Sequence, residues 1–182
     1  IDAGHGGHDS GCTDNAGTRL EKDDDLEMAL AVKKNLESRG VEVIMTRETD
    51  VFISLDDRCE IANESGADLF ISIHRNSTTV GNGVEIWVRN DMPEVDTALA
   101  ENIINFVDEV GVSENRGVRS GYQGNYDANY QVNSQTDIPS CLVELGFMTY
   151  HEDNVLFDKY FNEYAEAISN AIIKTGNDLG ID

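Results

Sequence analysis

The sequence predicts a single α/β domain, in which a mainly parallel, twisted sheet carries helices on both faces. Short apolar segments alternate along the chain with segments of helical periodicity, and this alternation is typical of parallel sheets. One apolar segment, ADLFISIH at 67–74, is almost continuously apolar, as expected of a strand that is buried on both sides. The 182 residues, 40% of them hydrophobic, are enough for one domain with its own core.

The first half of the chain is expected to hold two helices with a strand between them. Acids crowd the start of the segment 21–40, basic residues gather near its end, and Gly40 is a natural stop for a helix. The segment VEVIMT at 41–46 is expected to be a strand. A second helix is expected over 54–63, with Ser54 as its N-cap.

The second half continues the alternation. Helices are expected over 96–110 and in the last part of the chain, where apolar residues mark one long closing helix. The stretch 120–137 is rich in Tyr, Asn, Gln and Ser, and is expected either to line a binding groove or to be a solvated loop. The remaining strands are expected at 67–74, 83–88 and 140–145.

The charge of the chain limits its partners. The 13 basic and 35 acidic residues give a formal net charge of −22, which repels phosphate backbones and argues against nucleic acid as a partner. No apolar run approaches the ~20 residues that a membrane-spanning helix needs. The 3 cysteines, an odd number without CxxC spacing, argue against a fully paired disulfide framework.

Three polar side chains stand where predicted strands end. His5 follows the first strand, His74 ends the strand at 67–74, and Glu144 lies near the end of the strand at 140–145. The carboxyl ends of parallel strands share one edge of the sheet, and ligands bind at that edge in α/β folds. These three groups are therefore expected to meet, with glycines beside His5 letting the backbone turn its imidazole over the sheet.

Two imidazoles and a carboxylate at one edge favour a metal site, because catalytic zinc takes three protein ligands of these kinds. His5 and His74 are the first two candidate ligands, and Glu21 qualifies as the third because the first helix starts at the same edge. Simpler interpretations remain: a hydrogen-bonded histidine, a solvated acid in a first helical turn, or a buried paired carboxylate for Glu144. His8 is the strongest competitor for the place of His5.

Sequence motifs along nearly the whole chain resemble one known family. In order, they are IDAGHGGHDSG at 1–11, EKD at 21–23, TRETD at 46–50, SIHRNS at 72–77 and LVELGF at 142–147. Together they are similar to the zinc-dependent N-acetylmuramoyl-L-alanine amidases of the amidase_3 type, which are bacterial cell-wall hydrolases. The resemblance implies an α/β sheet with flanking helices.

The resemblance also implies a reaction: hydrolysis of the amide bond between N-acetylmuramic acid and L-alanine of the peptidoglycan stem peptide. It assigns the Zn²⁺ ligands to His5, Glu21 and His74, and the catalytic carboxylate to Glu144. The implied partners are the glycan strand and the stem peptide of peptidoglycan. The implied location is secreted, at the cell wall or facing the periplasm.

Two further residues and the extent of the domain complete these expectations. Asp9 and Asn76, close in sequence to the two histidines, are candidates to orient the imidazoles, and Asn76 is also expected to contact substrate. The region 1–182 is expected to be one amidase catalytic domain taken from a longer secreted protein, because only Ile1 to Ala3 precede the first glycine.

Two other functions compete with the amidase interpretation. Another zinc hydrolase of the cell wall, a carboxypeptidase or a deacetylase, would use the same metal and the same glutamate. A peptidoglycan-binding or acidic cation-binding module would need no Glu144, and the chain shows no EF-hand pattern.

Overall fold

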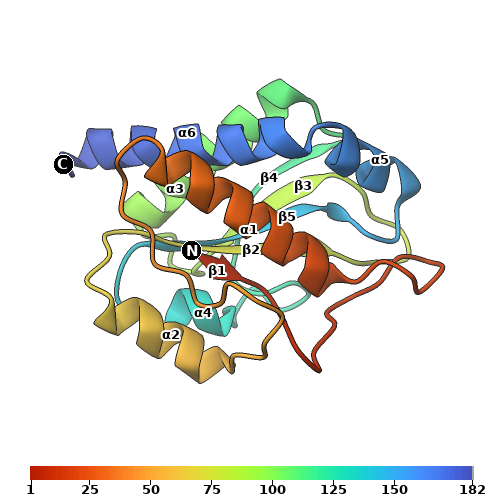
Figure 1. Cartoon of the computed structure of the whole chain (residues 1–182), viewed down its shortest axis with the longest axis horizontal. Coiled ribbons are helices and arrows are strands. Elements are labelled where there is room, and N and C mark those ends of the chain that lie inside the picture. The colour runs from red at the N-terminus through yellow and green to blue at the C-terminus, as the bar shows by residue number, and fades with distance from the viewer. Residues whose placement is uncertain (182) are drawn as a thin grey trace.

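The computed structural model describes residues 1–181 and is built on a five-stranded sheet in the order β1–β2–β5–β3–β4 (Figure 1). β1, β2 and β5 run parallel, β3 pairs antiparallel with β5, and β4 runs parallel to β3. The predicted α/β class with a mainly parallel sheet is confirmed. The strands are β1 (Asp2–Ala3), β2 (Phe70–Asn76), β3 (Val84–Val88), β4 (Asn115–Ser120) and β5 (Ser140–Phe147).

Helices cover both faces of the sheet, as predicted (Figure 1). α1, α3 and α6 pack on one face, and α2 and α4 lie on the other. Within residues 1–181, no helix combines the length and apolar character that a membrane span requires. The helices are α1 (Glu21–Glu37), α2 (Leu55–Glu64), α3 (Glu94–Val110), α4 (Gln131–Ser134), α5 (His151–Lys159) and α6 (Phe161–Leu179).

Alternation along the strands divides the interior into two layers. On β2, Ile71 and Ile73 join the larger core beneath α1, α3 and α6, whereas Phe70 joins a smaller cluster beneath α2 and α4. Residues two apart on a strand share a face. His74 therefore lies on the side of the smaller cluster. Glu144, which pairs with His74 across β2 and β5, lies on that side as well.

A buried ion pair ties β1 to α2. Asp2 Oδ1 lies 2.6 Å from Arg58 Nη1, and their side chains are 0% and 3% exposed. The Asp2 carboxylate also accepts hydrogen bonds from the hydroxyls of Thr46 and Ser72, each at 2.6 Å. Burial acts to raise the pKa of Asp2, but Arg58 and the two hydroxyls outweigh burial, so this pKa lies below its usual value.

The predicted strand at 41–46 is wrong. This segment lies beside Ile1, whose backbone nitrogen donates to Ile44 O at 2.6 Å and whose carbonyl accepts from Thr46 N at 3.1 Å. These two hydrogen bonds tie the segment to the edge of the sheet, but the segment forms no strand ladder. Its alternating sequence favours a strand, and only a longer partner would have let it form one.

Three other elements differ from the prediction. β4 and α4 were not predicted, because NRGVRS is polar and α4 is only 4 residues long. The single closing helix is two helices, α5 and α6, which meet at Tyr160. α2 is confirmed, and the Ser54 hydroxyl accepts from Asp57 N as the N-cap pattern predicts.

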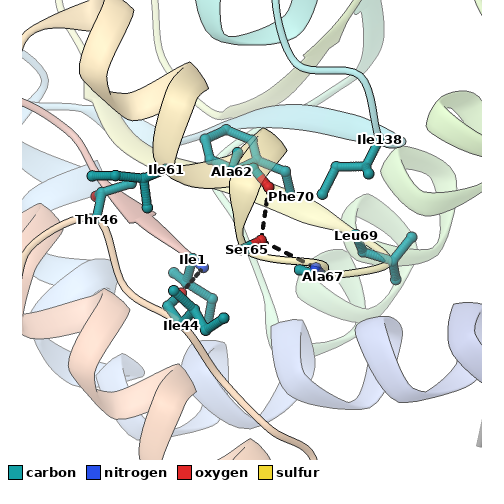
Figure 2. Close-up of a pocket in the computed structure, with 10 residues that line it drawn as sticks. All are labelled: Ile1, Ile44, Thr46, Ile61, Ala62, Ser65, Ala67, Leu69, Phe70 and Ile138. Atoms are coloured by element: carbon teal, nitrogen blue, oxygen red, sulfur yellow. Dashed lines mark hydrogen bonds between the residues drawn. The ribbon is translucent and has the colours of Figure 1, made fainter.

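A small apolar pocket lies between the segment 41–46 and α2 (Figure 2). Its volume of about 20 Å³ suffices for about one water molecule. Ser65 Oγ donates to Ala62 O and accepts from Ala67 N at its floor, and no titratable side chain lines it. The pocket is therefore a packing gap without ionisable side chains.

Asp2→Asn removes the counter-ion of Arg58 and leaves the guanidinium buried. We expect the free energy of unfolding at pH 7 to fall by about 3–5 kcal/mol in urea denaturation. Because the folded pKa of Asp2 is lowered, its contribution is fully present above the unfolded value of about 3.9 and is lost as pH falls through the folded value. The difference from wild type should therefore shrink only below about pH 4.

The exposed Glu60→Gln variant, also on α2, is the matched control and should unfold like wild type. A loss of less than about 1 kcal/mol for Asp2→Asn would contradict the importance of the buried pair.

Candidate active site

The side chains of His5, Glu21 and His74 meet at the carboxyl edge of β1 and β2. Glu21 Oε1 lies 3.1 Å from His5 Nε2 and 3.0 Å from His74 Nδ1. The two imidazole rings are 5.1 Å apart at their centroids and nearly perpendicular, at 83°. With Asp25, these residues bring four donor atoms within 4.8 Å of one another, a group that could hold a metal ion.

The backbone at His5 turns the imidazole into this group. His5 has φ of +57°, in the left-handed region that few residues other than glycine adopt, and Gly6 follows at +125°. The turn involves His5 itself as well as the flanking glycines that the sequence predicts for it. Hydrogen bonds hold the loop on both sides, from Arg58 Nη2 to His5 O at 2.6 Å and from Gly4 N to Ile73 O at 3.0 Å.

Asp9 orients the His5 ring, as predicted. Asp9 Oδ2 lies 2.8 Å from His5 Nδ1, so that the other nitrogen, Nε2, faces Glu21. Burial acts to lower the pKa of His5, but Glu21 and Asp9 outweigh it and raise this pKa. The same interactions with the histidines overcome burial at Glu21 and hold its pKa well below the usual value.

Asn76 does not orient the His74 ring. Its side chain donates to Glu85 Oε1 at 2.8 Å and accepts from Ser77 N at 2.7 Å. It is nearly buried at the floor of the site, and its contact with substrate stays a prediction.

Glycines at two positions make room for the converging side chains. A Cβ at Gly4 would overlap His74 Cε1 and lie 2.7 Å from Asp25 Oδ2. A Cβ at Gly11 would lie 2.6 Å from both Glu21 Oε2 and His5 Cδ2. Any larger residue at either position would displace members of the group.

Glu144 lies beside this group and is not hydrogen-bonded through its Oε2 atom within residues 1–181. It pairs with His74 across β2 and β5 and with Glu85 across β5 and β3. Burial, reinforced by the charges of Glu21 and Glu85, raises the pKa of Glu144 well above its usual value. An ionisable group with one free oxygen is thus held at the floor of the site.

A cavity of about 550 Å³ opens over these residues, within the usual size range of ligand sites. Its walls come from the segment around the start of α2 (Phe52, Ile53 and Leu55) and from the stretch 120–137 (Tyr122, Gln123, Tyr130 and Gln131). Tyr122 and Tyr130 lie against each other, with ring centroids 4.6 Å apart. The expectation that 120–137 lines a groove is confirmed for these side chains.

The two remaining histidines lie outside the group. His8 packs on Phe52 with ring centroids 4.3 Å apart, and is therefore not the alternative to His5. His151 begins α5. Sequence reasoning missed Asp25, because an acid in the first turns of a helix has no distinguishing pattern.

Comparison with known proteins identifies the family. The sequence profile described as N-acetylmuramoyl-L-alanine amidase (Amidase_3) matches residues 1–174. The chain belongs to the N-acetylmuramoyl-L-alanine amidase family. The resemblance predicted from the motifs is thereby confirmed, and every residue of the site described above lies within the matched part of the chain.

Individual relatives agree in sequence and in fold. The protein named "Probable cell wall amidase LytH" of Staphylococcus epidermidis is 35% identical over 177 residues, which are 95% of this chain and 55% of LytH. The N-acetylmuramoyl-L-alanine amidase from Clostridium difficile 630 matches with a TM-score of 0.87 and 31% identity, covering 96% of this chain and 93% of that one. The amidase AmiC2 of Nostoc punctiforme matches with a TM-score of 0.84 and 39% identity, covering 96% of this chain and 93% of AmiC2.

The chain spans about half of the length of the curated relative LytH, because the matched residues are 55% of LytH. It covers nearly all of the two solved amidase structures.

Gly4→Ala tests whether the site depends on the space at Gly4. We expect the free energy of unfolding to fall by about 1–3 kcal/mol, because the new methyl group overlaps His74 and presses on Asp25. Zinc affinity, measured by titration, should fall with it.

Gly176→Ala on α6 is the matched control, since its Cβ would meet no atom closer than 4.0 Å. This variant should be as stable as wild type or more so, because alanine favours a helix over glycine. Equal stability and zinc affinity of Gly4→Ala and wild type would contradict the packing argument.

Proposed function

We propose that the chain hydrolyses the amide bond between N-acetylmuramic acid and the L-alanine of the peptidoglycan stem peptide, with Zn²⁺ as cofactor. One observation carries the proposal. In a domain of the amidase family, three donor atoms converge from His5, Glu21 and His74, and Glu144 stands beside them at the floor of an open cavity.

The residues fit a zinc ion in three respects. Two imidazole nitrogens and one carboxylate oxygen are the ligand types of catalytic zinc sites. Gly4 and Gly11 keep free the space that a Cβ would fill between these groups. Asp9 fixes the His5 ring through the nitrogen that does not face Glu21, in the manner of residues that support ligating histidines. His5, Glu21 and His74 would hold the ion.

When bound, zinc would polarise the scissile carbonyl and make a water molecule more acidic. Glu144 is placed to move the protons of the reaction. Its carboxylate takes a proton from the attacking water as the C–O bond forms, and gives that proton to the L-alanine nitrogen as the C–N bond breaks. The Oε2 atom supports this role, because it has no hydrogen-bond partner within residues 1–181 that it would have to give up.

The walls of the cavity suit a substrate made of sugars and a peptide. Tyr122 and Tyr130 offer ring faces, and Gln123 and Gln131 offer amides that donate and accept hydrogen bonds. Phe52 and Leu55 provide an apolar surface elsewhere in the cavity. We propose that the glycan strand and the stem peptide lie along these surfaces, and that the protein acts outside the cytoplasm, at the cell wall.

Family membership favours an amidase over a carboxypeptidase or a deacetylase, which could use the same groups. A module that only binds peptidoglycan would have no use for a buried glutamate with a free oxygen. Mass spectrometry of digested muropeptides separates the reactions. The amidase releases a free lactyl carboxylate and a new L-alanine amine, whereas release of D-alanine or acetate would identify the other hydrolases.

Glu144→Gln should keep bound zinc and lose at least ~100-fold in the rate of peptidoglycan hydrolysis, because an amide cannot carry the proton. Zinc content and turnover are measured on the same preparation. His74→Ala is the complementary variant and should lose the metal. Turnover near the wild-type rate in Glu144→Gln would remove Glu144 from the proton-transfer role.

Tyr122→Ala should raise KM for peptidoglycan fragments several-fold and leave kcat nearly unchanged, because the ring contacts substrate away from the reacting bond. Steady-state kinetics with a soluble muropeptide provide the measurement. Tyr150→Ala is the control, since Tyr150 is also exposed but does not line the cavity. Equal KM values for the two variants would place the substrate elsewhere.

A further inference from the structure

Asp25 is a buried side chain next to the predicted metal ligands. It stands one helical turn after Glu21 on α1, on the same face of the helix. Its side chain is 0% exposed, and Oδ2 lies 3.9 Å from His74 Nδ1. Asp25 belongs to the group whose four donor atoms lie within 4.8 Å of one another.

Neither oxygen of Asp25 has a hydrogen-bond partner within residues 1–181. Arg47 is near enough to attract the carboxylate, but its nitrogens donate to the backbone carbonyls of Ala3, Gly4, Lys22 and Thr49. The preceding residue, Asp24, is by contrast fully engaged: it accepts hydrogen bonds from Arg19 and Arg75. Of these two neighbouring acids on α1, Asp24 is therefore paired with arginines, whereas Asp25 has no hydrogen-bond partner within residues 1–181.

A buried carboxylate without a partner destabilises a protein, and such groups in native structures are normally paired or bound to a cation. The fold adds a second observation. Gly4 lies between Asp25 and His74, and a Cβ at this position would touch both. Gly4 thus lets the Asp25 carboxylate and the His74 imidazole lie closer together than any residue with a side chain at this position would.

We propose that Asp25 is a fourth side chain of the metal centre beside His5, Glu21 and His74, and that its anionic charge strengthens cation binding from the α1 side. This inference rests on the proposed function, in which the cation is Zn²⁺. It assigns to Asp25 a role apart from the three ligands and from Glu144. It also makes α1 stability depend on the cation, because the ion supplies the partner that the protein does not.

The test compares wild type, Asp25→Asn and the exposed control Asp23→Asn on the same helix. Each protein is stripped with a chelator and titrated with Zn²⁺ against a chromophoric competitor, and its thermal midpoint is measured with and without zinc. For Asp25→Asn we expect zinc Kd to rise about 10–100-fold. We also expect its metal-free midpoint to rise by about 2 °C or more, because an amide at this buried position costs less than a carboxyl group without a partner.

The stabilisation by zinc should therefore be smaller in Asp25→Asn than in wild type, and Asp23→Asn should match wild type in every measurement. A purely structural Asp25 would leave zinc Kd unchanged, and that result would overturn the inference. Failure of metal-free Asp25→Asn to fold, or a lower midpoint, would overturn it as well. Wild type that binds no zinc would instead refute the proposed function, so the two failures are distinct.

Discussion

The parallel pairing of β2 with β5, which sets His74 opposite Glu144, is the constraint on which the site depends. Their neighbours Ile73 and Val143 are also paired and are buried in the larger core. Successive side chains point to opposite faces, so a slip of one residue in either strand would send a polar group into that core. The burial of the apolar residues thereby fixes where the reactive groups stand.

Much of this arrangement could be predicted from the sequence. His74 and Glu144 end apolar strands, and His5 follows another, so the rule for parallel sheets brings them to one edge. Glu21 needed the family resemblance, because an acid in the first turn of a helix is usually solvated. The position of Glu21 between both histidines appears only when α1 is packed against the sheet.

Other features depend on tertiary contacts that no local pattern encodes. The polar segment NRGVRS becomes β4 because β3 offers it a partner, whereas the more strand-like 41–46 has backbone hydrogen bonds to the sheet edge, within residues 1–181, only at Ile1. Likewise, no sequence pattern distinguishes Asp24 from Asp25, which are consecutive aspartates at the start of α1. One turns toward two arginines and the other toward His74, a proposed metal ligand, and only the helix rotation in the packed domain separates them.

The guanidinium of Arg58 has a consequence for the movements of the groove. It donates to Ile53 O at 3.0 Å on one side and to His5 O at 2.6 Å on the other. One side chain therefore links the wall around Ile53 to the loop of His5, and an outward movement of this wall would have to break one of these hydrogen bonds or strain the loop that places the imidazole. The opposing segment around Tyr122 and Tyr130 is held mostly by local turns, so we expect the cavity to widen on that side more readily than on the side of Ile53.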